Sequence, residues 1–239
     1  MVFKSKNTID RFDPNTPISS EQMYEIENIG HDKFGMKKLV MMENAGHSLA
    51  DLIIKKFKKK LVKKKIIAVC GTGNNGGDAM VAMRHISGKY NMPISIILVG
   101  SPDSIKTEES RINWNIVKKM KHTINIKICK NINDEIKKEI NDADIIVDGI
   151  FGTGIKGEIK NLHAEIIKLI NKSNAFTVSV DIPSGLDPNN GFVSTPCIHS
   201  DFTVTFHRIK HGLLKNKKYT GKILLESIGI PTEIEKEVL

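Results

Sequence analysis

Short apolar runs alternate with amphipathic segments along most of the chain after residue 65. Runs rich in Ile and Val predict strands, and segments with apolar residues three and four positions apart predict helices. Strands are expected at 66–70, 94–99, 124–128, 144–148 and 176–180, with weaker strands near 202–206 and 222–225. Helices are expected between them at 77–88, 105–120, 133–140 and 161–171.

Continuous apolar strands separated by amphipathic helices are typical of a parallel sheet that is covered on both faces. The pattern therefore predicts an α/β fold: a doubly wound, Rossmann-like, mostly parallel sheet between helices in a three-layer αβα arrangement. Two further helices are expected before the first strand, one starting near Glu21 after a Ser19 or Ser20 cap and one from Met42 to Phe57. No internal repeat or linker is visible, so a single domain over 1–239 is expected, with 1–18 as a polar N-terminal arm.

Three motif loops follow predicted strands at their carboxyl ends. They are GTGNNGGD (Gly71 to Asp78), DGIFGTGIKGE (Asp148 to Glu158) and DIPSGLD (Asp181 to Asp187). Ligands of open parallel sheets bind beyond the carboxyl ends of the strands, so the loops predict one shared site. Glycines permit a close approach of backbone and ligand, and the N–H groups at a helix start attract phosphate. The paired asparagines and the aspartate of the first loop indicate that it also recognises a substrate group or an ion.

An ordinary NAD-binding domain is one alternative, because Gly71, Gly73 and Gly76 formally match the GxGxxG fingerprint. That fingerprint expects a ribose-binding acid about 20 residues further on, at the end of the second strand. The second strand ends near Val99, however, and the nearest carboxylate is Asp103, well inside the following loop. Ordinary dinucleotide redox chemistry is therefore disfavoured.

Three polar residues at the strand ends are candidates for chemistry. Asp181 ends an apolar strand and is a candidate general acid or base, with hydrogen bonding to loop amides as the structural alternative. Asp148 suits either a turn cap or a hard cation with oxygen ligands. Ser184 is a candidate oxygen ligand, and no GxSxG elbow surrounds it that would indicate a hydrolase nucleophile.

Composition excludes several classes of function. The net charge is +9, but eight lysines lie between Lys55 and Lys65, where a solvated helix end and loop is expected, with steering of an anionic ligand as the alternative. Aromatic residues make up only 5% and do not alternate with basic ones, so no nucleic-acid partner is expected. The three cysteines lack disulfide or zinc spacing and are expected to be reduced.

Neither a secretory signal nor a long apolar span is visible in the sequence. A cytoplasmic protein without a membrane partner is expected. The polar arm with its basic residues leaves organelle targeting as an alternative.

Four motifs in a fixed order relate the chain to a known family. MMENAG (Met41 to Gly46), GTGNNGGDAMVAMRHI (Gly71 to Ile86), DGIFGTGIKGE and VDIPSGLD together closely resemble the NAD(P)H-hydrate epimerases, from about Ser20 to Ile228. The resemblance implies interconversion of the R and S forms of hydrated NADH and NADPH (NAD(P)HX), in which water has added at C6 of the nicotinamide ring. This is a repair step that precedes dehydration of the S form, and it needs no redox cofactor.

The resemblance also implies roles for individual residues. Asp181 would be the catalytic residue and would contact the substrate. The other implied substrate contacts are Asn74, Asn75, Gly76, Gly77, Asp78, Gly152, Thr153, Gly154, Ile155, Lys156, Gly157 and Glu158. One potassium ion per subunit would be held by Asn75, Asp148 and Ser184 with backbone carbonyls, which are all oxygen ligands.

Partners follow from the same resemblance. A homodimer is expected, with the two helices before the first strand as candidate interface. A separate ADP- or ATP-dependent dehydratase is expected to act on the S product, because the chain ends at Leu239. The main alternative is a non-enzymatic ligand-binding or scaffold module of the same fold, against which the intact polar residues of the three loops argue. The preference between hydrated NADH and hydrated NADPH stays open at this stage.

Overall fold

The computed structural model of the protein describes residues 13, 15–90, 92, 94–154 and 159–239. Within these residues seven strands form one sheet in the order β3-β2-β1-β4-β5-β6-β7, and all neighbouring strands are parallel. The strands are β1 (Ile66–Cys70), β2 (Ile94–Val99), β3 (Ile124–Cys129), β4 (Ile145–Gly149), β5 (Phe176–Val180), β6 (Phe202–Phe206) and β7 (Lys222–Glu226). The predicted α/β fold is confirmed, including both weaker strands.

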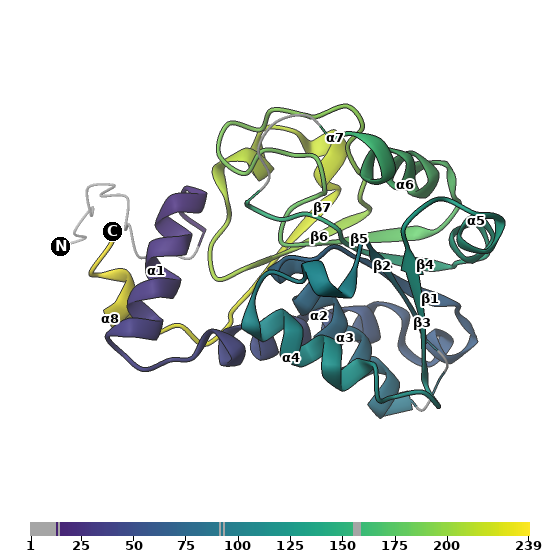
Figure 1. The fold of residues 1–239 in the computed structure, drawn as a ribbon. Helices are drawn as coiled ribbons and strands as arrows, with labels where there is room; N and C mark the ends of the chain where they lie inside the picture. The colour runs from purple at the N-terminus through teal and green to yellow at the C-terminus, as the bar shows by residue number, and fades with distance from the viewer. Residues whose placement is uncertain (1–12, 14, 91, 93, 155–158) are drawn as a thin grey trace.

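Helices cover both faces of the sheet (Figure 1). Those on one face are α2 (Lys38–Phe57), α3 (Asn74–Tyr90) and α4 (Glu108–Val117), and those on the other are α5 (Asp134–Asn141) and α6 (Asn161–Lys172). Successive side chains of a strand point to opposite faces of the sheet. Ala68 and Ile96 therefore pack in the core beneath α2 and α3, whereas Ile67 and Ile97 pack in the core beneath α5 and α6. Because the strands are apolar on both faces, helices can cover both faces of the sheet.

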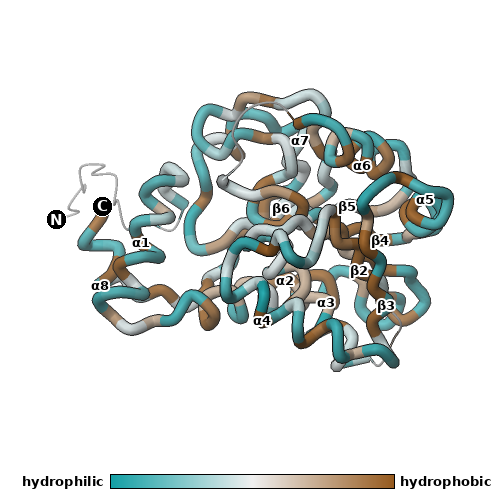
Figure 2. Tube along the Cα trace, in the orientation of Figure 1, coloured by the Kyte–Doolittle hydropathy of each residue, from teal (hydrophilic) through white to brown (hydrophobic). Residues whose placement is uncertain are grey.

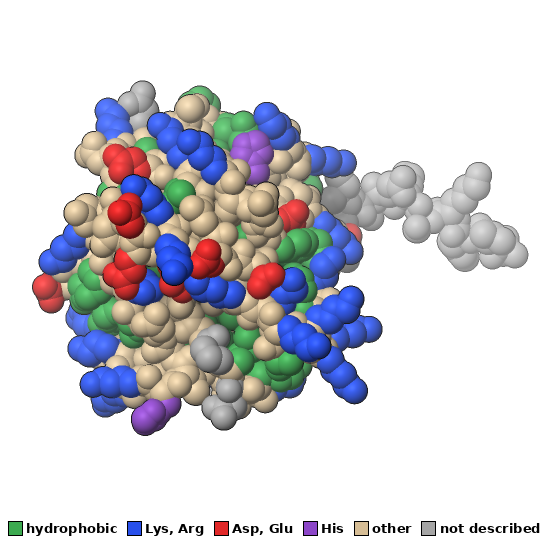
Figure 3. Space-filling view, turned by 90° about the vertical axis from the view of Figure 1, so that its right-hand side faces the viewer, with side chains coloured by type: hydrophobic (Ala, Val, Ile, Leu, Met, Phe, Trp, Pro, Cys, Tyr) green, Lys and Arg blue, Asp and Glu red, His purple; other side chains and the backbone are tan. Residues whose placement is uncertain are grey.

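Hydrophobic residues concentrate in the central strands, as Figure 2 shows. Lys and Arg side chains are spread over the face in Figure 3, with Asp and Glu between them. The predicted lysine-rich segment forms the end of α2 and a short 3-10 helix (Lys58–Lys63), and Lys64 pairs with Asp144 on the neighbouring loop. The cysteines are buried and unpaired, as expected. None of the described helices combines the length and apolarity that crossing a membrane requires.

The main differences from the sequence prediction lie at helix starts. α3 begins at Asn74, three residues before the predicted start, although asparagine and glycine are poor helix formers. Tertiary packing of the Gly-rich turn outweighs that propensity. α4 begins at Glu108 with Thr107 as its cap, because Pro102–Ser104 first forms a separate 3-10 helix.

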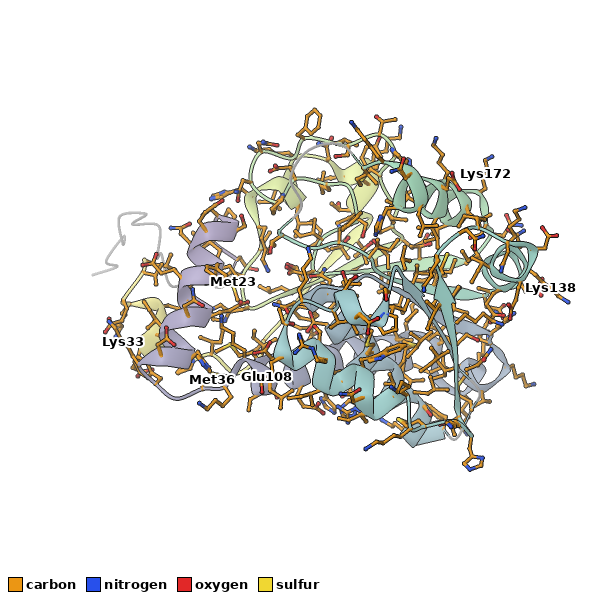
Figure 4. All side chains as sticks on the ribbon, in the orientation of Figure 1. Met23, Lys33, Met36, Glu108, Lys138 and Lys172 are labelled. Atoms are coloured by element: carbon orange, nitrogen blue, oxygen red, sulfur yellow. The ribbon has the colours of Figure 1, made fainter. Side chains whose placement is uncertain are left out.

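The N-terminal helix lies apart from the two helical layers (Figure 1). α1 (Ser20–Asp32) is capped by Ser19 in a capping box and contacts the short α8 (Thr232–Glu235). Met23 lies on the side of α1 that faces the sheet, as Figure 4 shows. Neither α8 nor α7 (Lys217–Thr220) was predicted, because a four-residue helix carries no periodic signal.

Most of the predicted N-terminal arm lies outside the described residues. Its last residue, Ile18, is buried and pairs with the segment after β6, where its N–H donates to Ile209 O at 2.9 Å. The arm thus ends beside the segment after β6 that contains Lys210. The assignment of 1–239 to one domain stays a prediction.

Candidate active site

A cavity of about 130 Å³ lies where the start of α3 and the segments after β4, β5 and β6 meet α1 and α2. Its polar lining includes Glu27, Asn75, Asp78, Asp181 and Lys210. Small-molecule sites usually enclose about 300–1,000 Å³. The cavity therefore has room for the reacting end of a larger ligand, while the rest of such a ligand would lie along the loops outside.

Asp181 follows β5 directly and has left-handed backbone geometry, with φ of +60°. Its N–H donates to Val204 O at 2.7 Å, so the strain of this conformation is held by the neighbouring strand. The side-chain Oδ1 accepts hydrogen bonds from Thr205 Oγ1 at 2.9 Å and from Phe206 N at 3.2 Å. Oδ2 accepts none from the described residues and is the oxygen that a ligand in the cavity can reach.

Lys210 completes the environment of Asp181. Its buried Nζ lies 2.5 Å from Asp181 Oδ1 and also donates to Phe206 O at 3.0 Å. A buried ammonium is costly unless it is paired, and this pairing fixes both side chains. Lys210 is a residue that the sequence prediction missed, because it lies in an irregular segment outside all four motifs.

The first motif loop turns tightly into α3. A Cβ on Gly76 would lie 2.1 Å from the Gly71 carbonyl oxygen, so only glycine permits this approach. Asn74 accepts a hydrogen bond from Thr107 Oγ1 at 2.7 Å, which ties the loop to the start of α4. Gly77 N donates to Gly73 O at 3.3 Å. The free N–H groups at the start of α3 are suited to an anionic group of a ligand.

The second motif loop packs against the first. A Cβ on Gly152 would lie 1.9 Å from Asn75 Oδ1, whereas a Cβ on Gly154 would meet no atom of the described residues within 4 Å. Thr153 lines the cavity. The predicted substrate contacts Ile155, Lys156, Gly157 and Glu158 lie outside the described residues.

Asp148, in β4, is fully buried and joins the second loop to the third. Its Oδ1 accepts from Ser184 Oγ at 2.6 Å, and its Oδ2 accepts from Ser184 N at 2.9 Å and Ser179 Oγ at 2.8 Å. Burial raises the pKa of Asp148, and the hydrogen bonds from Ser184 and Ser179 oppose the rise. Asp187, by contrast, accepts from the N–H groups of the next turn and has the role of a turn residue.

Two of the three predicted potassium ligands lie beside the carbonyl of Phe151, and the third, Asp148, is hydrogen-bonded to one of them. Asn75 Nδ2 donates to Phe151 O at 3.3 Å and to Val180 O at 2.5 Å, and Ser184 Oγ lies 3.3 Å from the same Phe151 oxygen. Two carbonyls thus meet the Asn75 amide, and the Ser184 hydroxyl links one of these carbonyls to the Asp148 carboxylate. If the Asn75 amide turned over, its oxygen would face both carbonyls, an arrangement that a cation between them would stabilise.

This all-oxygen set, with one carboxylate, fits a hard cation of low charge. A site built from nitrogen or sulfur ligands is not indicated in the described part of the chain, where no cluster of three His, Cys, Asp or Glu residues is arranged for a metal.

Two of the other carboxyl groups that line the cavity have raised pKa values. Asp78, on α3, is buried, and its burial together with the charge of Asp181 raises its pKa well above the usual range. Glu27, on α1, is half-buried, and desolvation raises its pKa to about 7 although Lys210 opposes the rise. The resemblance pointed to Asp78, but nothing in the sequence marked Glu27, which occupies an ordinary position of an amphipathic helix.

The arrangement suits proton transfer rather than redox chemistry. Carboxyl groups in different environments line one small cavity, and backbone N–H groups and a cluster of oxygens lie on its rim. Groups with perturbed pKa values in a cleft are typical of catalytic sites.

Comparison with known proteins gives consistent results. The profile of a family described as "YjeF-related protein N-terminus" matches residues 38–212. The chain is 44% identical to an NAD(P)H-hydrate epimerase of Cenarchaeum symbiosum, over 93% of this chain and 99% of that protein. It is 43% identical, over the same shares, to the protein of the same name from Nitrosopumilus maritimus.

A longer relative and a solved structure add to this. A bifunctional NAD(P)H-hydrate repair enzyme of Methanothermobacter thermautotrophicus is 38% identical over 87% of this chain, which spans 39% of that protein. The crystal structure of yeast ynu0 superposes with a TM-score of 0.78 at 23% identity, covering 93% of both chains. At that identity the superposition supports the fold alone.

Proposed function

This chain belongs to the family described as "YjeF-related protein N-terminus", and from that membership we propose that it works as an NAD(P)H-hydrate epimerase. It interconverts the R and S forms of hydrated NADH and NADPH at C6 of the nicotinamide ring. The reaction repairs a damaged cofactor and transfers no electrons. The catalytic assignment rests on the position of Asp181, which lines the cavity. Lys210 holds its Oδ1, and no described residue donates a hydrogen bond to its Oδ2.

Epimerisation at C6 needs proton transfer in both halves of the reaction. A proton given to the C6 hydroxyl lets the C–O bond break with loss of water, and the N1 lone pair stabilises the resulting cation by forming an N1–C6 double bond. Water then adds to the other face of C6 and gives up a proton. Asp181 takes part in this proton transfer, since its position is fixed and one oxygen is available to the ligand.

The rest of the substrate serves to position the ring. The diphosphate lies at the start of α3, where Asn74, Asn75 and Gly76 present backbone N–H groups, and along the loop that contains Thr153. Binding energy from these remote groups places the ring in a cavity that is too small for the whole molecule. The roles of Gly77, Gly152 and Gly154 are to let the two loops approach each other and the ligand.

One potassium ion per subunit is part of the proposal. The oxygens of Asn75, Asp148 and Ser184, with the carbonyls of Phe151 and Val180, would hold it. When bound, the ion supplies positive charge that fixes the relative positions of the three motif loops.

Partner and location complete the proposal. The chain works as a homodimer through its two N-terminal helices and the turn between them, where the exposed apolar side chains Tyr24, Phe34 and Val40 lie. A separate ADP- or ATP-dependent dehydratase consumes the S product, and the reaction takes place in the cytoplasm. Sedimentation of the purified protein as a monomer at micromolar concentration would contradict the dimer.

The test is the conversion of purified R-form NADPH hydrate to the S form, coupled to an S-specific dehydratase, in potassium buffer. The expected result is conversion well above the spontaneous rate in the presence of the protein. If the folded protein gives no acceleration with either hydrate, the chain is a ligand-binding or scaffold module that keeps the fold and lacks the reaction.

A further inference from the structure

A second acidic side chain lies across the cavity from Asp181. Glu27 belongs to α1, which lies apart from the sheet in Figure 1, whereas Asp181 belongs to the sheet edge at the end of β5. Both side chains line the cavity between these elements. Glu27 is half-buried, and within the described residues it has neither a hydrogen bond nor an ion pair. Buried polar groups normally have hydrogen-bond partners. The Glu27 carboxyl has none among the described residues and can therefore accept a ligand as its partner.

The stereochemistry of the reaction requires access to both faces of the ring. The hydroxyl leaves from one face of C6, and water adds to the other. Asp181 is held by Lys210, Thr205 and the backbone of Phe206, so it cannot follow the reaction from one face to the other. Either the ring turns over inside a small cavity or a second group serves the opposite face.

We propose that Glu27 is that second group, and that Glu27 and Asp181 exchange protons with opposite faces of C6; the inference rests on the proposed epimerase function. In one direction, protonated Glu27 gives its proton to the departing hydroxyl, the C6–O bond breaks, and the N1 lone pair forms the N1–C6 double bond. Water adds to the other face, the double-bond electrons return to N1, and Asp181 takes the proton of the added water. Solvent carries the proton back from Asp181 to Glu27.

The charges around the two carboxyls suit these opposite roles. Desolvation chiefly, together with the charge of Asp181, raises the pKa of Glu27 to about 7, although Lys210 and Lys38 oppose the rise. Both forms of Glu27 therefore exist near neutral pH. The Lys210 ammonium lies 2.5 Å from Asp181 Oδ1, whereas Glu27 has no such partner among the described residues. Two acidic groups in different surroundings are the arrangement expected of an acid and a base.

The third carboxyl of the cavity is less suited to the opposite face. Asp78 belongs to α3, whose first turn is bound to the sheet edge through Asn75 and Val180 O. It therefore lies on the same wall as Asp181. Burial raises the pKa of Asp78 well above its usual range, which favours its neutral form, and a neutral carboxyl can donate a hydrogen bond. Glu109 is the remaining acidic group in the lining, on α4.

The test measures inversion and oxygen exchange separately in oxygen-18 water. Each purified epimer is incubated with the parent protein, Glu27→Gln, Glu27→Asp, Asp78→Asn or Asp181→Asn, and both the inverted fraction and the label at the C6 hydroxyl are measured. A carboxyl that serves one face can remove the hydroxyl on its side and return labelled water to the same side. Glu25→Gln, at an exposed position of α1, is the matched control.

We expect Glu27→Gln to lower the rate of inversion about 100-fold or more while label still enters one epimer. Asp181→Asn should also lose inversion but should still label the other epimer, the one that Glu27→Gln does not label. Glu27→Asp should restore part of the inversion. The inference is overturned if Glu27→Gln catalyses inversion as fast as Glu25→Gln does, or if Glu27→Gln loses inversion and all labelling together. It is also overturned if Asp78→Asn, and not Glu27→Gln, is the variant that loses inversion and keeps labelling. Absence of inversion by the parent protein would instead remove the proposed function itself.

Discussion

Lys210 places its ammonium 2.5 Å from the Asp181 carboxylate, and this buried pair organises the candidate active site. Asp181 reaches it because left-handed geometry at the end of β5 turns its side chain across the end of β6. The pair holds one oxygen of Asp181 and leaves the other free for a ligand.

Replacing Lys210 by Met should destabilise the protein and slow epimerisation. The change leaves the largely buried Asp181 carboxylate without its partner, which costs about 3 kcal/mol of the free energy of unfolding. Urea denaturation at pH 7 measures the loss. Lys33→Met is the matched control, because Lys33 pairs with Glu237 at the surface and such a pair contributes less than about 1 kcal/mol. Equal effects of the two substitutions would contradict the role given to Lys210.

Gly152→Ala should disturb the contact between the first two motif loops. The new Cβ would lie 1.9 Å from Asn75 Oδ1, and such overpacking costs about 1–3 kcal/mol. Because Asn75 must move, epimerisation should fall as well. Gly154→Ala adds a methyl group that meets none of the described residues, and it should leave the free energy of unfolding within about 0.5 kcal/mol of the parent. Thermal denaturation of both variants decides the matter, and an unaffected Gly152→Ala would show that the loops separate easily.

Potassium should stabilise the folded protein independently of catalysis. At about ten times its Kd, an ion that binds only the folded state adds about 1.4 kcal/mol, or roughly 3–6 °C in Tm for a chain of this length. Tm is compared in potassium chloride and in tetramethylammonium chloride at equal ionic strength. Ser184→Ala should abolish most of the difference. If the parent has the same Tm in both salts, the oxygen cluster around Phe151 holds no potassium.

Glu27→Gln should stabilise the protein at high pH. The pKa of Glu27 is raised from 4.5 to about 7, so between these values the folded state binds a proton that the unfolded state has lost. The stability of the parent therefore falls as pH rises through this window, and the cost is fully present above it. Glu27→Gln removes the cost and should gain about 1–3 kcal/mol at pH 8.

At pH 4 the gain should vanish, because Glu27 is then protonated in both states. Glu25→Gln, whose position is exposed, should show no such pH dependence. Urea denaturation of the parent and both variants at pH 4, 6 and 8 gives the comparison. A Glu27→Gln variant that is no more stable than the parent at pH 8 would mean that Glu27 is not desolvated.

Sequence patterns were sufficient for the sheet and for the meeting of the motif loops. Strands β1 and β4 contain continuous apolar runs, whereas β5 alternates apolar residues with Thr177 and Ser179, and the carboxyl ends of all three carry the motifs. A parallel sheet places these ends at one edge, where Asp148 and Ser184 meet. The parallel pairing follows from the alternation of strands and helices, whereas the order of the strands is known only from the structure.

Other parts of the site carry no such signal. Lys210 follows β6 by four residues in an irregular segment, and its position depends on how the chain turns at His207, where φ is +62°. Glu27 occupies one position of an amphipathic helix whose docking depends on tertiary packing. The pattern of a helix shows which face is buried but not which polar residue at the margin of that face reaches a cavity.

The most direct test of the account is the epimerase activity of Asp181→Asn beside that of Asp187→Asn. Asp187 lies in the same loop and holds a turn through its Oδ1, which an asparagine oxygen can replace. With purified R-form NADPH hydrate in potassium buffer, the Asp187 variant should epimerise as the parent does. The Asp181 variant, which should still fold although Lys210 loses its charged partner and Tm falls, should be slower by about 100-fold to 10,000-fold. Parent-like activity of Asp181→Asn would contradict the central claim that this carboxylate carries the proton transfer.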